Sequence, residues 1–201
     1  MPEPGDIAAV VLAAGTSRRF GSDKLLHPVT LGGKTMPLAA HSLFPWLAVF
    51  KQVSVVVRPE AENFCSGMET ALGGIRSAQI CWVVCDNAAQ GMAASLACGV
   101  NANADAAGWL IGLADMPLVP PCAIAGVKDA LLSGAPLAAP ERKGRLGHPV
   151  GFAARYRDEL LALEGDRGAR HLLMRDAVVC IGINDEGIFA DIDVPADLQE
   201  V

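Results

Sequence analysis

The sequence predicts a single-domain α/β protein with a largely parallel sheet. Strand-like apolar runs recur along the chain, helix-length segments separate several of them, and no long linker divides the 201 residues. Apolar residues make up 52% of the chain, which is enough to build the core of one domain of this size. We therefore expect a single domain over residues 1–201, with one sheet at its centre.

The first strand is expected at Ile7–Leu12, because six consecutive apolar residues are typical of a strand covered on both faces. A loop of small residues follows, with cations at Arg18, Arg19 and Lys24. In open α/β sheets, ligands bind beyond the carboxyl ends of such strands. Small residues let backbone N–H groups approach an anion, and the cations offset its charge. The loop therefore predicts a polyphosphate ligand.

The glycine spacing in this loop excludes two common phosphate-binding motifs. Gly15 and Gly21 are separated by five residues, and Lys24 follows three positions later. This fits neither GxxxxGK[ST] nor GxGxxG. A basic turn without a ligand is the alternative interpretation.

The later elements continue the alternation. Gly32 and Gly33 predict a tight turn between strands at 28–31 and 34–36, and apolar residues at helical spacing follow from 38 to 47. The Pro- and Gly-rich residues 140–149 are expected to be irregular and to face the substrate. Further strands are expected at 52–57, 80–85, 109–114, 137–139, 150–153 and 178–183, and helices at 60–72 and 121–132.

Composition excludes several classes of partner. A net charge of −6 argues against a nucleic-acid surface, and no apolar run approaches the about 18 residues that a membrane span needs. Residues 1–6 are acidic, whereas a signal peptide begins with basic residues. Six cysteines without a CxxC pair predict reduced thiols, and the histidines form no zinc pattern. We expect a cytoplasmic protein that binds neither nucleic acid nor membranes.

Several motifs together resemble one enzyme family. The run Leu12-Ala13-Ala14-Gly15, followed by Ser17, Arg18, Gly21 and Lys24, resembles the LAAGxSxRxGxxK signature of nucleotidyltransferases that consume nucleoside triphosphates. Further similar segments lie at 90–96, 113–117, 147–152, 165–170 and 191–198. In their order and spacing the motifs are similar to those of molybdenum cofactor cytidylyltransferases, within the MobA/MocA-like NTP transferases.

This resemblance implies a Rossmann-like, three-layer α/β/α fold of the nucleotide-diphospho-sugar transferase type, with a mixed, mostly parallel sheet. It also implies a nucleotide-binding part at about residues 1–135 and an acceptor-binding part at about residues 136–201.

Two acidic positions are candidate Mg²⁺ ligands. Asp115 closes the strand at 109–114 and so lies at the ligand edge of the sheet, and the matching acid of the family binds the metal. Asp191 and Asp193 alternate in an extended segment that turns both side chains to one face, so either could complete the site. Asp193 matches the family position better. The alternatives are a turn or cap role for Asp115 and helix capping before Pro195 for Asp193.

Cations and a helix start are expected to hold the nucleotide. Lys24 is the candidate for stabilising the charge that develops on the α-phosphate, and Arg18 for holding the β- and γ-phosphates. Arg19 could be a solvated neighbour. Gly91 and Ser95 begin a predicted helix whose N–H groups and hydroxyl could read a base or ribose, although an ordinary helix start explains them equally.

Three further residues are candidates for specificity. The methyl group of Ala14 stands where guanylyl-transferring relatives resemble LAGG, so it would narrow the pocket against a purine and favour cytosine. His148 and Asp166 lie in segments that resemble the family's acceptor pocket. A structural histidine in a Gly-Pro turn and a helix N-cap are the respective alternatives.

Together with these residues, the resemblance therefore implies transfer of CMP from CTP to the terminal phosphate of a molybdopterin-type acceptor, with Asp115 and Asp193 holding Mg²⁺. The resemblance also implies a recipient enzyme of the molybdenum hydroxylase class. One alternative is a related transferase that uses another phosphorylated acceptor, such as a sugar or alcohol phosphate, or GTP as donor. The other is a non-catalytic carrier of the cofactor, although Lys24 together with the two carboxylates favours catalysis.

Overall fold

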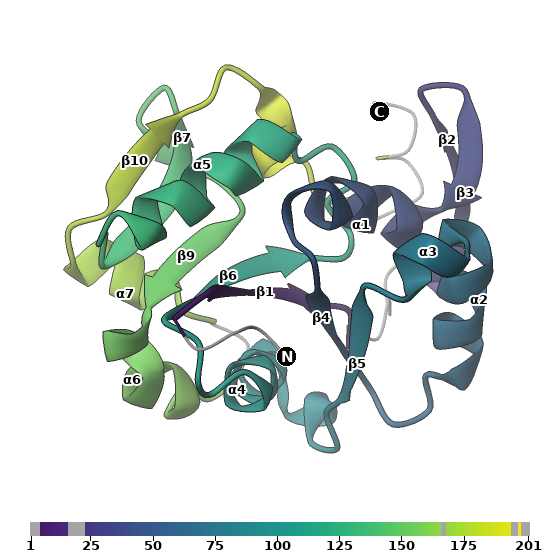
Figure 1. Ribbon diagram of the computed structural model, residues 1–201, viewed down its shortest axis with the longest axis horizontal. Coiled ribbons are helices and arrows are strands. Elements are labelled where there is room, and N and C mark those ends of the chain that lie inside the picture. Colours follow the sequence, from purple (N-terminus) through teal and green to yellow (C-terminus); the bar gives the residue numbers. More distant parts are fainter. Residues whose placement is uncertain (1–4, 16–22, 166–167, 194–196, 198–201) are drawn as a thin grey trace.

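A computed structural model describes residues 5–15, 23–165, 168–193 and 197. They form three layers, with one sheet between two groups of helices (Figure 1). The strands are β1 (Ile7–Leu12), β2 (Pro28–Leu31), β3 (Lys34–Pro37), β4 (Val53–Val57), β5 (Ile80–Val84), β6 (Gly108–Leu113), β7 (Leu137–Arg142), β8 (Arg145–Leu146), β9 (Val150–Ala153) and β10 (Val179–Gly182). The α-helices are α1 (Leu38–Val49), α2 (Glu62–Leu72), α3 (Gly74–Ser77), α4 (Met92–Ala102), α5 (Pro121–Leu132), α6 (Arg157–Leu161) and α7 (Arg170–Arg175).

The central sheet is mixed and mostly parallel, as predicted. Its strand order is β10-β7-β9-β6-β1-β4-β5, with β8 paired to β7. Strand β9 runs antiparallel to both of its neighbours, and β8 runs antiparallel to β7. The remaining pairs are parallel. Strands β2 and β3 form a separate hairpin, which confirms the tight turn expected at Gly32 and Gly33.

Two apolar cores form because β1 buries both of its faces. Ile7, Ala9 and Val11 face the core under α1, α2 and α5, and the alternate residues face the core under α4, α6 and α7. Every residue of β1 is buried, which explains why the strand has no polar alternation. Figure 1 shows α1 and α5 on one side of the sheet and α4 and α6 on the other.

A glycine lets α4 lie close to the sheet. A Cβ at Gly99 would overlap the side chain of Val10 and come within 2.9 Å of Val56. Only a residue without a side chain permits this approach of helix and strands. The second half of α4 is thereby held directly against β1 and β4.

Residues 140–149 differ from the expectation of irregular structure. Strand β7 continues to Arg142 and turns back into β8 through Lys143 and Gly144, which both have positive φ values, 53° and 78°. Two such residues form the tight loop that matches the twist of a hairpin. Prediction failed here because proline at 140 suggested a break, whereas it occupies a strand without needing a donor at that position.

The other predicted elements are confirmed with small shifts at their ends. The strand at 150–153 and the helix at 121–132 have the predicted bounds. All six cysteines are free thiols. Among the residues described, no helix combines the length and the hydropathy that crossing a membrane would require.

Candidate functional site

The candidate site lies where β1 and β6 end side by side. Leu12 is in register with Leu113, and the Ala114 N–H donates to the Leu12 carbonyl at 3.0 Å. The Ala13 N–H donates to the Val56 carbonyl at 2.8 Å, which ties the following loop to β4. The carboxyl ends of three parallel strands therefore place the small-residue loop next to Asp115, as the sequence predicted.

Lys24 joins two carboxylates at this edge. Its Nζ donates to Asp115 Oδ2 at 2.8 Å and to Asp193 Oδ1 at 3.2 Å. The Lys24 side chain is 8% exposed, whereas the Asp115 and Asp193 side chains are 25% and 49% exposed. A buried ammonium thus lies between two carboxylates that remain open to solvent on their other sides.

The backbone holds Asp193 in place against the loop after β6. The Ile192 N–H donates to the Asp115 carbonyl at 3.0 Å, and the Asp193 N–H donates to Asp197 Oδ2 at 2.7 Å. The Ile192 side chain is buried against Val29 and nearby apolar residues. These contacts bring together acids that are 78 positions apart in the sequence.

Electrostatics keep the Lys24 side chain charged. Burial lowers its pKa, but the hydrogen bonds and charges of Asp115 and then Asp193 outweigh burial and hold the pKa above the ordinary value. The group is therefore an ammonium at neutral pH, as a residue that opposes phosphate charge must be.

A cavity of about 360 Å³ opens beside this ion-pair cluster. It gathers every predicted nucleotide-binding residue that the structure describes. Those lining it are Leu12, Ala13, Ala14, Gly15, Lys24, Gly91 and Ser95, together with Asp115. Arg18 and Arg19 lie outside the described residues. The structure thus brings the predicted residues together, and their nucleotide-binding role stays a prediction.

A second cavity, of about 690 Å³, adjoins the first. The two cavities share Leu12, Met92 and Leu113 as lining residues, so a donor and an acceptor could lie in contact across this boundary. His148 and Asp191 line the larger cavity. Asp166, the other predicted acceptor residue, lies outside the described residues.

The two candidates for the second metal-binding carboxylate therefore have different surroundings. Asp193 contacts Lys24, whereas Asp191 faces the larger cavity. Sequence reasoning ranked Asp193 first but could not separate them, because alternation along a strand puts both on one face.

Sequence reasoning missed Arg145 and Phe189. The Arg145 guanidinium lies 4.3 Å from the centroid of the Phe189 ring, and both residues line the larger cavity. The two-residue loop before β8 was the only local signal for this hairpin, and nothing in the sequence pairs its arginine with a phenylalanine 44 positions away.

His148 is a neutral polar group in the wall of the larger cavity. Its Nδ1 is buried and finds no hydrogen-bond partner among the residues that the structure describes. Burial lowers the pKa of His148 below the ordinary 6.5, against the opposing charges of Asp115 and Asp191. The ring is therefore uncharged at neutral pH and offers one donor and one acceptor.

This pKa shift predicts an acid-sensitive fold. Because the pKa is lower in the folded than in the unfolded chain, the contribution of His148 to stability is complete above pH 6.5 and is lost as the pH falls below it. We expect urea denaturation to show a smaller loss of unfolding free energy between pH 7.5 and pH 5.5 in His148→Gln than in the wild type. Equal losses in the two proteins would contradict the assignment.

The carboxylates at Lys24 have the chemistry for a divalent cation. Asp115 and Asp193 place oxygen atoms around a single cationic group, and both retain solvent exposure. Mg²⁺ commonly takes one or two protein carboxylates and completes its coordination with phosphates and water. Within the described ranges, no set of three or more His, Cys, Asp or Glu side chains could hold a metal by itself. The residues thus fit a metal that arrives with a phosphate ligand.

Comparison with known proteins identifies the family. Residues 9–179 match the MobA-like NTP transferase domain, which covers most of the chain and leaves out of the strands only the first two residues of β1 and the last three of β10. The chain belongs to the MobA-like NTP transferase family. It is therefore a nucleotidyltransferase with the expected three-layer fold. No curated protein matches the sequence significantly.

Solved structures agree with this membership. A Rv0371c homologue from Mycobacterium sp. strain JC1 is 26% identical, with a TM-score of 0.77 over 96% of this chain and 93% of that chain. Rv0371c from Mycobacterium tuberculosis, in complex with manganese, is 25% identical, with a TM-score of 0.74 over 97% of both chains. Molybdopterin-guanine dinucleotide biosynthesis protein A from Archaeoglobus fulgidus shares the fold, at 22% identity and a TM-score of 0.66 over 96% of both chains.

Proposed function

We propose that this MobA-like nucleotidyltransferase transfers CMP from CTP to a molybdopterin-type acceptor, giving molybdopterin cytosine dinucleotide and pyrophosphate. The observation that carries the proposal is the Lys24–Asp115–Asp193 cluster beside the smaller of two adjoining cavities, which Lys24 and Asp115 line. A non-catalytic carrier would need only a cavity of suitable shape, whereas this cluster has the charges that phosphoryl chemistry requires.

The chain's own residues account for the chemical step. In the proposed reaction, an oxygen of the acceptor phosphate forms a bond to the α-phosphorus as the bond to the β-phosphate oxygen breaks, and pyrophosphate leaves with the bonding electrons. Lys24 opposes the charge that develops on the α-phosphate. No general base is needed, because the acceptor phosphate is already ionised. The adjoining cavities hold the reactants in contact, which removes much of the entropic barrier.

A divalent cation is part of the proposal. Asp115 and Asp193 would hold it, and its chemistry when bound is to neutralise phosphate charge and bridge the nucleotide to the protein. The manganese bound in the structure of Rv0371c supports a divalent cation in a protein of this fold at 25% identity.

The walls of the larger cavity favour a flat, weakly polar acceptor. Most lining side chains are apolar, including Leu96, Ile111, Phe152 and Leu173, and polar groups are confined to a few positions such as His148. A polyol or sugar phosphate would bury hydroxyl groups without partners against such walls, which is unfavourable. A heteroaromatic ring system can instead lay its flat faces against the apolar walls and turn its polar edge to the few polar lining groups, such as His148, Arg145 and Asp191. This observation supports a pterin over a sugar as the acceptor's body.

The choice of nucleotide is the first experiment. The purified chain is incubated with Mg²⁺, molybdenum-loaded molybdopterin and each nucleoside triphosphate in turn, and pyrophosphate release and the mass of the pterin product are measured. We expect release with CTP and a cytidine dinucleotide product. Use of GTP instead would contradict the proposed preference for cytosine but would be consistent with the proposed transfer mechanism. No release with any nucleotide would contradict the proposed reaction.

Ala14 provides the matching variant. It is 6% exposed and lines the smaller cavity, where its methyl group would limit the space for a base. We expect Ala14→Gly to raise the use of GTP relative to CTP by about tenfold, the usual size of a single-carbon effect in an apolar pocket. Ala14→Ser keeps the Cβ atom and adds a hydroxyl group, so it should retain the preference for CTP. An unchanged ratio in Ala14→Gly would exclude Ala14 as the base filter.

A further inference from the structure

The candidate metal ligands already share a cation in the free protein. Lys24 Nζ lies 2.8 Å from Asp115 Oδ2 and 3.2 Å from Asp193 Oδ1. These are hydrogen-bond distances for charged groups, so the ammonium occupies the point at which the carboxylates converge. Asp115 and Asp193 lie 78 positions apart in the sequence, and Lys24 links them through a side chain that is itself buried.

A divalent cation and this ammonium compete for the same oxygen atoms. An ion bound by both Asp115 and Asp193 would stand at close range to the Lys24 charge, and like charges at that range repel. Burial strengthens this repulsion, because the low exposure of Lys24 limits screening by water. On this argument the free protein would bind the metal weakly while Lys24 stays in place.

A bound nucleotide would offer Lys24 an alternative partner. It lines the smaller cavity together with Ala14, Gly15 and other small residues that leave room for phosphates. The four-carbon stem of lysine is flexible, and its ammonium group can change direction while its first carbons stay packed. A triphosphate in this cavity would supply anionic oxygens to Lys24 and would also bring ligands for the metal.

We propose that Lys24, in addition to its role at the α-phosphate, holds Asp115 and Asp193 together in the free protein and releases them to the metal only when a nucleoside triphosphate enters. Metal and nucleotide then bind as a coupled pair, each increasing the affinity for the other by the same factor. The inference deepens the proposed function, because it concerns how that site is loaded. It does not depend on the identity of the acceptor.

Binding of Mn²⁺ to the full chain, without acceptor, tests the proposal. Free and bound Mn²⁺ are separated by their electron paramagnetic resonance signals. We expect weak binding by the wild type and at least tenfold tighter binding by Lys24→Met, because removing the ammonium removes a positive charge that repels a divalent cation at the two carboxylates. Lys24→Arg keeps the charge and should bind as weakly as the wild type. An affinity in Lys24→Met equal to that of the wild type would overturn the proposal.

A second substitution locates the bound ion. Adding Asp115→Asn to Lys24→Met should remove the gain, because one of the two carboxylates is neutralised. Retention of the tight binding in the double variant would place the ion elsewhere and overturn the proposal. Near-ultraviolet circular dichroism shows whether each variant keeps its packing.

The wild type provides an independent measurement if Lys24→Met does not fold. Protein-bound Mn²⁺ is determined by equilibrium dialysis with and without α,β-methylene-CTP, and a chamber without protein gives the metal held by the analogue alone. We expect the analogue to tighten Mn²⁺ binding to the protein at least tenfold. Equal affinity with and without the analogue would overturn the inference. Failure of CMP transfer with the coupling intact would instead contradict the proposed reaction alone.

Discussion

Replacing Asp115 with asparagine is expected to slow pyrophosphate release from CTP by a hundredfold to a thousandfold while the fold is retained. Asp115 accepts a hydrogen bond from Lys24 at 2.8 Å and is a candidate metal ligand, so the substitution weakens both the position of the ammonium and the attraction for the cation. Loss of one group that stabilises developing charge typically costs about 2.7 to 4 kcal/mol of transition-state stabilisation. The measurement is kcat and KM in the pyrophosphate assay.

Asp191→Asn is the matched control for this substitution. The residue lies on the same segment as Asp193 but faces the larger cavity. We expect its substitution to raise the KM for the acceptor and to leave the KM for CTP close to that of the wild type. Asp193→Asn should lower kcat as Asp115→Asn does, because Asp193 also contacts Lys24. Full activity in Asp115→Asn would contradict its assignment as a metal ligand. If Asp191→Asn lowered kcat more than Asp193→Asn, Asp191 would be the second metal ligand in place of Asp193.

The site edge could be predicted from the sequence because parallel strands share a direction. An unbroken apolar run identified β1, and an apolar run closed by an acid identified the end of β6. Once both strands belong to a parallel sheet, their carboxyl ends meet, and the pairing of Leu12 with Leu113 follows from that arrangement. The position of Asp115 beside the small-residue loop therefore required only local patterns and one topological rule.

The contacts within the site could not be predicted in the same way. Lys24 meets Asp115 across 91 positions and Asp193 across 169, and no local pattern states which of several acids a lysine reaches. The larger cavity takes lining residues from both sides of residue 135, such as Ile111 and His148, and the division of the chain there into a nucleotide-binding and an acceptor-binding part stays a prediction. Such a cavity exists only after long-range packing has joined its walls.

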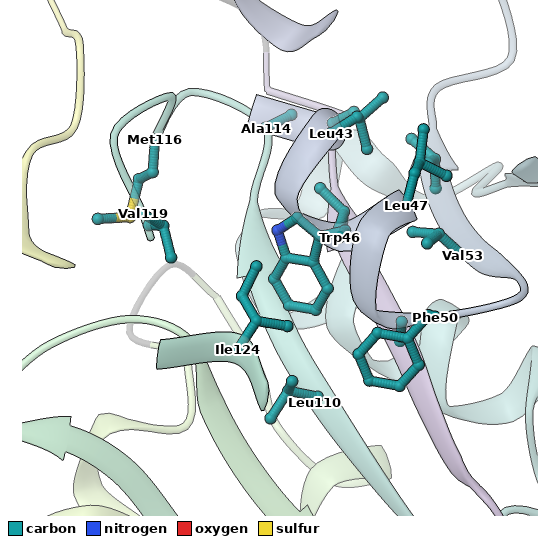
Figure 2. Close-up of a cluster of buried hydrophobic side chains, with 14 of the residues drawn as sticks. Leu43, Trp46, Leu47, Phe50, Val53, Leu110, Ala114, Met116, Val119 and Ile124 are labelled. Carbon is teal, nitrogen blue, oxygen red and sulfur yellow. The ribbon is translucent and has the colours of Figure 1, made fainter. Parts of the chain in front are cut away.

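Packing next to the site shows how the core supports the chemistry. Trp46 of α1 is 2% exposed and lies against β6 among Leu110, Ala114 and Ile124 (Figure 2). A Cβ at Gly112 would overlap the Trp46 ring, so the strand leaves a gap that the indole fills. Gly112 precedes Asp115 by three residues. The ring therefore packs against the last part of the strand that delivers the candidate catalytic acid.

Removing the indole is expected to produce the largest loss of stability among these substitutions. Trp46→Ala should lower the free energy of unfolding by about 3 to 5 kcal/mol, because it removes buried apolar surface and leaves a cavity that the rigid sheet cannot close. Urea denaturation with an unchanged m-value measures this loss. Ile75→Ala is the control, since this side chain is 90% exposed and its loss should change stability by less than about 0.5 kcal/mol. A loss below about 1 kcal/mol in Trp46→Ala would contradict the packing.

The contact between Trp46 and Gly112 can be tested by combining substitutions. Gly112→Ala alone should destabilise the protein by about 1 to 3 kcal/mol, because the added methyl group overfills the space beside the indole. In Trp46→Leu the ring is absent and that space is open, so adding Gly112→Ala should have a much smaller effect there. Residues in contact show such coupling, whereas independent sites give additive losses. Additive losses would mean that the strand before Asp115 shifts to accept the methyl group, and kcat of Gly112→Ala would then fall with its stability.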